Sequence, residues 1–325
     1  MKVSVALTTY NGEKYILKQL HSLLFQRHTI DEVIICDDAS TDDTPNIIKN
    51  FIKKNQLSHW HLNINSKNIG FINNFKNAIK KTTGDVIFLC DQDDIWYKTK
   101  VGSMLNRFES DERVKGLFSG FTFIDENDNI ISVHKNFLHS NNNLIKFRIE
   151  PFETVKINFD TICSYNISPG CTFAFTREVK DIFLSKTKNV CIHDWELALI
   201  AAFLDGLYFF NTPLTNYRIH SENAIGLSEI VKNNNQKKLI SFDVRLNKAK
   251  KMLNYLESME PYYYLLNETN LNILKEKTDF VNMRFNALSE KSLSKILNLY
   301  KYKNNYFKAV TFKGRIADII CILKK

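Results

Sequence analysis

The sequence predicts an α/β fold, with a mainly parallel sheet flanked by helices and a helical region after it. Short apolar runs alternate with helical patterns through the first hundred residues, as in strands joined by right-handed helical crossovers. The runs show no polar alternation, Val86–Cys90 being an example, which is typical of strands buried on both faces. From about Ser228 onward the apolar spacing is helical, and no further strand is indicated.

The elements follow one another in a regular order in the first half of the chain. The predicted strands there are Val3–Leu7, Val33–Cys36, His61–Ile64 and Val86–Cys90. The helices between them are expected at about Glu13–Gln26, Pro45–Lys54 and Ile72–Lys81. The second half is less regular, with strands at Gly116–Ile124, Ile167–Phe175 and Tyr208–Phe210, a polar connection over Ser140–Phe159 and a helix over His193–Leu204.

Charge divides the chain near residue 225. The 325 residues include 44 Lys plus Arg against 35 Asp plus Glu, a net charge of +9. Residues 1–225 hold 25 basic and 26 acidic side chains, whereas residues 226–325 hold 19 and 9. We therefore expect a near-neutral domain of residues 1–225 and a basic α-helical region of residues 226–325, with Asn233–Asn235 in the linker. No nucleic-acid recognition motif accompanies the basic residues, so a nucleic-acid partner is not expected.

Apolar runs and cysteines indicate a cytoplasmic protein. The longest uncharged apolar stretch, Leu197–Leu204, is far shorter than the roughly 18 residues that a membrane span needs. The six cysteines lie singly in apolar stretches, without a CxxC pair, so reduced packing thiols are expected.

Polar residues follow each predicted strand of the first half, where ligands bind to open parallel sheets. The sharpest of these loops is Asp91-Gln92-Asp93-Asp94, in which three carboxylates lie within four residues. They repel one another unless a cation or hydrogen-bond donors face them. Hard oxygen ligands suit Mg²⁺ or Mn²⁺, and a solvated turn that caps the next helix is the alternative.

Asp37-Asp38 repeats this arrangement one strand away. A carboxylate at this place commonly accepts a hydrogen bond from a ribose or a base, and Asp38 is the candidate. Asp42 before Pro45 also makes a helix start, and the two roles are compatible. Neither GxGxxG nor GxxxxGK[ST] is present, which disfavours dinucleotide oxidoreductases and P-loop enzymes.

Four motifs together resemble glycosyltransferase family 2, the inverting enzymes of GT-A fold. They are Thr8-Thr9-Tyr10-Asn11-Gly12, Asp37-Asp38-Ala39-Ser40-Thr41-Asp42, Asp91-Gln92-Asp93 and His193-Asp194-Trp195. The resemblance covers residues 1 to about 225 and keeps the family's order. It implies a nucleotide-sugar half at about residues 1–110 and an acceptor half at about 111–225.

The resemblance also implies roles for individual residues. Asp194 would be the general base that takes the proton from the acceptor hydroxyl. Asp93 and His220 would hold the metal, which stabilises the diphosphate leaving group. The alternatives are a helix N-cap for Asp194 and an ordinary loop histidine for His220. Nucleotide-binding roles fall to Thr9, Tyr10, Asn11, Asp38, Asn68 and Asp91.

Three residues are candidates for contact with the acceptor. Gly170 looks like part of the family's acceptor-side strand, or it forms a tight bend in a buried strand. Trp96 and Trp195 each follow an acidic motif and either stack on sugar rings or pack in the core. The QxxRW motif of processive members is absent, so the resemblance implies transfer of one sugar.

The strings Cys90–Trp96, His193–Ala198 and Tyr217–His220 look most like bacterial rhamnosyltransferases that use dTDP-rhamnose. A UDP-hexose carrying galactose, glucose or GlcNAc is the alternative donor. The implied acceptor is a saccharide, and a lipid-linked one in bacterial surface polysaccharide synthesis is expected. A nucleotidyltransferase is disfavoured because no glycine-rich triphosphate loop follows the first strand. Asp93 and Asp194 argue against a non-catalytic sugar-nucleotide-binding scaffold.

Residues 291–325 carry nine basic side chains and one acidic side chain, interleaved with aromatic residues. Basic helices with aromatic residues suit an anionic membrane interface. We therefore expect peripheral association with the inner face of the cell membrane. A solvated helical bundle that packs on the catalytic domain is the alternative.

Overall fold

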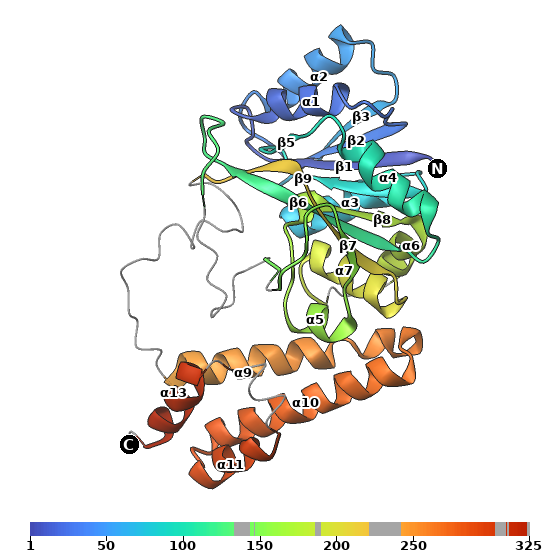
Figure 1. The fold of residues 1–325 in the computed structure, drawn as a ribbon. Coiled ribbons are helices and arrows are strands. Elements are labelled where there is room, and N and C mark those ends of the chain that lie inside the picture. The colour runs from blue at the N-terminus through green and yellow to red at the C-terminus, as the bar shows by residue number, and fades with distance from the viewer. Residues whose placement is uncertain are drawn as a thin grey trace. The chain divides into compact units, whose positions relative to one another are not determined.

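The computed structural model describes residues 1–132, 144–145, 147–185, 190–220, 242–302, 310 and 312–323 (Figure 1). They divide into two compact units, one within residues 1–220 and one within residues 242–323. The predicted boundary near residue 225 and the linker Asn233–Asn235 lie outside the described residues.

One mixed, mostly parallel sheet forms the centre of the first unit. Its strand order is β3-β2-β1-β4-β8-β6-β9-β5, and β7 pairs with β9. The first four strands are parallel to one another, whereas β8 runs antiparallel between β4 and β6. The strands are β1 Val3–Thr9, β2 Glu32–Asp37, β3 Trp60–Ile64, β4 Val86–Cys90, β5 Ile95–Trp96, β6 Gly116–Ile124, β7 Thr154–Lys156, β8 Phe173–Thr176 and β9 Leu207–Arg218. This architecture confirms the predicted fold class.

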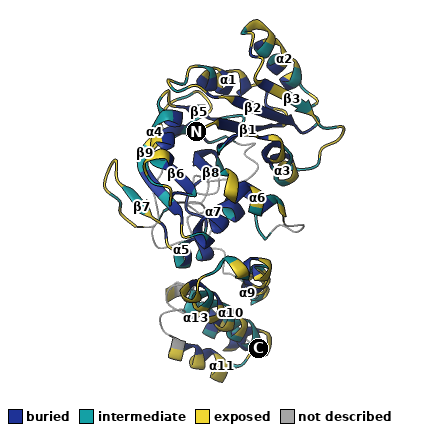
Figure 2. Ribbon diagram, turned by 90° about the vertical axis from the view of Figure 1, so that its right-hand side faces the viewer, coloured by how far each residue is buried: buried dark blue, intermediate teal, exposed yellow. Residues whose placement is uncertain are grey.

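Helices cover both faces of the sheet. Helices α1 and α2 lie on one face, and α3, α6 and α7 lie on the other, as Figures 1 and 2 agree. Strands β1, β2 and β4 are buried along their whole length, which explains their mostly apolar runs (Figure 2). The helices are α1 Ile16–Leu24, α2 Thr44–Lys54, α3 Phe71–Lys81, α4 Lys100–Ser110, α5 Phe159–Ser164, α6 Arg177–Ser185 and α7 His193–Phe203.

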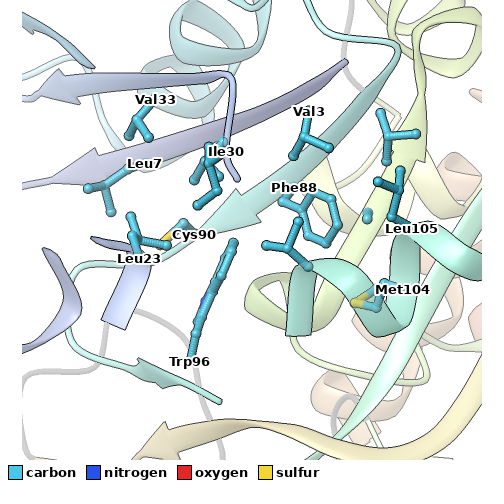
Figure 3. Packing of buried hydrophobic residues seen from close by; sticks show 14 of the residues in the cluster. Val3, Leu7, Leu23, Ile30, Val33, Phe88, Cys90, Trp96, Met104 and Leu105 are labelled. Atoms are coloured by element: carbon cyan, nitrogen blue, oxygen red, sulfur yellow. The ribbon is translucent and has the colours of Figure 1, made fainter. Parts of the chain in front are cut away.

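The main core lies between the sheet and helices α1, α2 and α4. Alternate residues of β1 and β4, such as Leu7 and Phe88, face it, because successive strand side chains point to opposite faces (Figure 3). Met104 and Leu105 of α4 pack into the same cluster. Trp96 of β5 is also part of it, with 2% of its surface exposed.

The structure corrects several expectations for the second half of the chain. The predicted strand Ile167–Phe175 is a strand only from Phe173, because a 3₁₀ turn at Gly170–Thr172 follows Pro169. The expected polar connection Ser140–Phe159 contains β7 and the start of α5. Helix α6 was not among the predicted elements, and the helix considered after the loop Asp91–Asp94 is α4, which begins only at Lys100. The strand predicted at Tyr208–Phe210 is the middle of β9, which continues to Arg218.

The second unit is helical in all its described elements. They are α9 Phe242–Glu257, a 3₁₀ turn at Glu260–Leu265, α10 Glu268–Ser289, α11 Leu293–Asn298, a 3₁₀ turn at Leu299–Tyr302 and α13 Phe312–Leu323. The Asn267 side chain caps α10 by accepting from the Asn270 N–H at 2.8 Å. Ala249, Leu256 and Leu274 are fully buried in this unit. Among the described helices of the chain, none is long and apolar enough to cross a membrane.

Candidate functional site

The polar strand ends of the first unit meet at one edge of the sheet. The register of the parallel pair places Thr9 at the end of β1 opposite Asp37 at the end of β2. The Thr9 hydroxyl donates to Asp37 Oδ1 at 2.7 Å. Asp37 also accepts from the Ser40 N–H at 2.9 Å, so it organises the loop after β2. Its neighbour Asp38 instead contacts the loop between β3 and α3.

Asp38 is 2% exposed and holds the loop between β3 and α3. Its Oδ1 accepts from the Ile69 N–H and its Oδ2 from the Gly70 N–H, each at 2.9 Å. Asn68 in the same loop is exposed, and its Oδ1 accepts from the Gly70 N–H at 3.0 Å. Gly70 has φ 83°, a conformation that glycine adopts readily. The structure therefore joins the two predicted nucleotide residues Asp38 and Asn68 through one backbone N–H.

The loop after β1 presents an exposed aromatic ring. Tyr10 is 46% exposed although it directly follows a buried strand. The Gln92 side chain accepts from the Tyr10 N–H at 2.8 Å and donates to the Tyr10 carbonyl at 3.0 Å. Asn11 has φ 47°, and its Oδ1 accepts from the Thr41 N–H at 2.9 Å. These bonds fix the backbone on both sides of the ring, so the ring can serve as a stacking surface.

Acidic groups gather behind the loop that follows β4. Ligand atoms of Asp91, Asp94 and Cys171 all lie within 4.8 Å of one another. Burial, followed by the neighbouring charges of Asp94 and Asp93, raises the pKa of Asp91 well above its usual range. Burial and then the charge of Asp93 raise the pKa of Asp94 to about 7. A positive charge close to these carboxylates would lower their pKa values again.

A buried lysine already supplies one positive charge. Lys100, the first residue of α4, is fully buried, and burial lowers its pKa to about 8. Its ammonium donates to the Cys171 carbonyl and, at 2.8 Å, to the Thr215 hydroxyl. It also lies 3.9 Å from the centre of the Trp96 ring, a cation–π contact.

Asp93 and His220 lie together beside this cluster. His220 Nε2 is 2.7 Å from Asp93 Oδ2, and the two side chains are 9% and 15% exposed. The imidazole ring lies 5.0 Å from the Tyr15 ring, centre to centre. Carboxylates with one imidazole suit Mg²⁺ and Mn²⁺, whereas the buried neutral thiol of Cys171 does not. The ligand types present, carboxylates with one imidazole, thus suit a hard divalent cation, and Asp93 and His220 contact each other in this structure.

Arg218 holds this part of the site in place. It is fully buried, its backbone N–H donates to Asp94 Oδ1 at 3.0 Å, and its Nε donates to the Asp93 carbonyl at 2.6 Å. Its Nη1 donates to the Asp125 carbonyl at 2.7 Å, and its Nη2 forms an ion pair with Asp128 at 2.6 Å. One side chain therefore ties the acidic loop to the turn after β6.

Asp194 lies in the first turn of α7 and is 4% exposed. Its Oδ2 accepts from the Asn166 side chain at 3.0 Å and its Oδ1 from the Trp195 N–H at 2.8 Å. Burial, partly offset by these hydrogen bonds, raises its pKa to about 6. Its charge is among those that raise the pKa of Asp91, so the two carboxylates are close to each other. A carboxylate titrating near neutral pH is well suited to accept a proton.

Gly170 lies directly against Asp194. A Cβ atom on Gly170 would be 3.0 Å from Asp194 Cβ and 3.3 Å from its Oδ2. Only a residue without a side chain leaves this space free. Gly170 begins a 3₁₀ turn, Gly170–Thr172, and borders the candidate base.

The tryptophans and His193 have different environments. Trp96 is buried in the core, so the expectation that it stacks on a sugar is corrected in favour of core packing. Trp195 is partly exposed, and its Nε1 donates to the Ile162 carbonyl at 2.7 Å. His193 is stacked on Phe75 with ring centres 4.0 Å apart, and burial lowers its pKa to about 3. It is therefore a neutral packing residue.

Sequence reasoning assigned no role to Lys100, Arg218, Asn166 or Gln92. Arg218 lies in the same motif as His220, Tyr217–His220, so its position close to the site could have been predicted from the sequence. Lys100 resembles a surface lysine at the start of a helix, and only the tertiary structure reveals its burial.

Comparison with known proteins identifies the family of the chain. The family model Glycosyl transferase family 2 matches residues 4–180. A dTDP-rhamnosyl transferase (RfbG) of Shigella flexneri is 30% identical over 239 residues, covering 68% of this chain and 73% of that protein. An uncharacterized glycosyltransferase of Nostoc sp. is 30% identical over 131 residues, covering 40% of each protein.

Solved structures with related folds have lower identity. TarS residues 1–349 of S. aureus with UDP-GlcNAc gives a TM-score of 0.56 at 14% identity, covering 94% of this chain and 93% of that one. A mannosyltransferase of Pyrobaculum calidifontis, solved with GDP-Man and Mn²⁺, gives 0.51 at 17% identity, covering 99% and 87%. These similarities concern the fold alone. The sheet and its flanking helices define the class of fold, the GT-A fold. The family model matches more than half of the chain, so the chain belongs to glycosyltransferase family 2.

Proposed function

We propose that the protein transfers one sugar, with inversion, from a nucleoside-diphosphate donor to a hydroxyl of a saccharide acceptor. The observation that carries this proposal is Asp194, a buried carboxylate with a pKa of about 6 that lies beside the acidic loop after β4. Asp194 takes the proton from the acceptor hydroxyl as that hydroxyl attacks the anomeric carbon. Asn166 and the Trp195 N–H hold the carboxylate in one orientation while it does so.

The donor nucleotide binds along the edge formed by the loops after β1, β2 and β4. Tyr10 offers an exposed ring for the base, and Thr9, Asn11, Asp38, Asn68 and Asp91 supply the polar contacts around it. Asp93 and His220 would hold Mg²⁺ or Mn²⁺, which would offset the negative charge of the diphosphate leaving group. Gly170 and Trp195 border the acceptor.

We further propose that the donor is dTDP-rhamnose. Support comes from the match to the Shigella flexneri dTDP-rhamnosyl transferase, which extends over 239 residues and therefore beyond the nucleotide half. A UDP-hexose donor is the alternative. The proposed acceptor is a lipid-linked saccharide of bacterial surface polysaccharide synthesis, reached at the inner face of the cell membrane.

Replacing Asp194 by Asn tests the proposed function. The amide keeps the shape of the side chain but cannot take a proton, so transfer should fall at least about a hundredfold while nucleotide affinity stays within about twofold. Transfer is followed as nucleoside diphosphate released from dTDP-rhamnose, UDP-hexoses and GDP-mannose in parallel. Asp181→Asn, on the exposed surface of α6, is the matched control and should keep full activity. Turnover by Asp194→Asn within a few-fold of the unaltered protein would disprove the assignment.

A further inference from the structure

Helix α13 of the second unit exposes a continuous apolar stripe. Phe312, Ile316, Ile320 and Leu323 are 68%, 42%, 43% and 62% exposed. Their spacing of four, four and three residues places them on one face of the helix. Among the described side chains of α13, these four are the ones classed as exposed. A stripe of large apolar side chains open to water indicates a surface that is covered in use.

The opposite face of α13 contains a buried charge. Asp318 is fully buried and pairs with Arg245 of α9, whose Nε lies 2.7 Å from Asp318 Oδ1. Arg284 of α10 also donates to it, at 3.1 Å from Nε to Oδ2 and 3.1 Å from Nη2 to Oδ1. At about 100° per residue, Asp318 lies nearly opposite the stripe. The inward face of α13 thus carries Asp318 beside the buried Ile322, while the outward face carries the apolar stripe.

The ion pairs fix the rotation of α13 about its axis. Turning the stripe inward would pull Asp318 away from both arginines and leave three charges without partners, which is strongly unfavourable for buried groups. The ion pairs of Asp318 therefore keep the stripe on the outside of this unit.

The positive charge of residues 291–325 indicates what kind of surface covers the apolar stripe. Residues 291–325 contain nine basic residues and one acidic residue, and the acidic residue is the buried Asp318. The guanidinium of Arg315 lies 5.7 Å from the ring of Phe312, so a cation borders the apolar stripe. A second copy of the chain would bring the same positive charge and be repelled. An anionic lipid surface offers both acyl chains for the stripe and negative headgroups for the basic residues.

We propose that α13 lies in the plane of an anionic membrane surface, with Phe312, Ile316, Ile320 and Leu323 among the acyl chains. Twelve residues of helix are about 18 Å long, well short of the roughly 30 Å hydrocarbon core, so the helix rests in the interface. The inference deepens the membrane site of the proposed function. It does not depend on the sugar-transfer step.

Vesicle sedimentation with the full chain tests this orientation. The double variant Ile316→Asp/Ile320→Asp places two carboxylates in the stripe without touching the buried ion pairs. Its partitioning onto phosphatidylglycerol vesicles should be at least about tenfold weaker than that of the unaltered protein, because apolar insertion is lost and the headgroups repel the new charges. Binding of the unaltered protein should fall with added salt and be much weaker on pure phosphatidylcholine.

Leu17→Asp is the matched control, since Leu17 is 46% exposed on helix α1 of the first unit. It should bind vesicles like the unaltered protein. Sugar-nucleotide hydrolysis and circular dichroism of the double variant report whether its fold is intact, independently of binding. Equal binding of the double variant and the unaltered protein would overturn the proposal. So would a dimer in sedimentation velocity that the double substitution dissociates, because the stripe would then be a contact between copies.

Discussion

Gly170→Ala should slow transfer without weakening donor binding. The added methyl group would lie 3.0 Å from Asp194 Cβ and 3.3 Å from Asp194 Oδ2, whereas ordinary contacts of this kind begin at 3.4 Å. Asp194 must therefore shift by a few tenths of an ångström. Its hydrogen bond from Asn166, 3.0 Å long, constrains the direction in which it can move.

The magnitude follows from the sensitivity of catalysis to position. A misplacement of about 1 Å can reduce the rate about a hundredfold, so a few tenths of an ångström correspond to about a tenfold loss of kcat. That factor equals about 1.4 kcal/mol of transition-state stabilisation. The nucleotide loops do not include Gly170, so the donor Kd should stay within about twofold.

The assay compares steady-state kcat with nucleotide affinity from calorimetry for the same preparation. Gly102→Ala is the matched control, because a Cβ there would meet only the His28 Cβ, at the ordinary distance of 3.4 Å. It should leave kcat unchanged. Full kcat in Gly170→Ala would show that Asp194 tolerates the shift and is not the positioned base. A parallel loss of donor affinity would show that Gly170 acts on the nucleotide instead.

Three further predictions concern titration and positioning. Transfer should rise with pH through about 6 and then level off, because Asp194 must be ionised to take a proton; a rate independent of pH between 5 and 7 would contradict its role. Burial lowers the pKa of His193 to about 3, so below pH 6.5 the unfolded chain binds a proton that the folded chain does not, and folding weakens as pH falls. In urea unfolding, the unaltered protein should therefore lose about 2 kcal/mol more stability between pH 7 and pH 5 than His193→Phe loses. An equal loss in both proteins would refute this. Arg218→Lys breaks the bonds to the Asp93 and Asp125 carbonyls and should weaken Mn²⁺ binding about tenfold in calorimetry with nucleotide present; unchanged Mn²⁺ affinity would exclude a positioning role.

The first, second and fourth strands could be predicted from the sequence because both of their faces are buried, whereas the third, Trp60–Ile64, is only partly buried. Val86–Cys90, for example, is uniformly apolar and ends where a carboxylate begins, so its bounds are visible in the sequence. The polar loops after these strands were predictable for the same reason. Parallel strands then bring their ends to one edge whatever the intervening helices contain.

The second half depended on long-range contacts that leave no local pattern. β9 carries mixed polarity because it pairs with β6, β5 and β7 along different parts of its length, so only its apolar centre was recognised. Lys100 is buried because Cys171, 71 positions later, and Thr215, 115 positions later, supply acceptors for its ammonium. Neither partner could be assigned to it from spacing.

Gln92 affects how far apart the nucleotide base and the diphosphate of the proposed donor would lie. Its side chain accepts from the Tyr10 N–H and donates to the Tyr10 carbonyl, as the backbone of a neighbouring strand would. These two bonds connect the loop after β1 to the loop after β4. The aromatic ring and the acidic cluster are thereby held at a fixed separation, and the two loops cannot part unless both bonds break. An uncharged side chain between two acidic ones thus sets the distance between the two loops that the proposed donor would bridge.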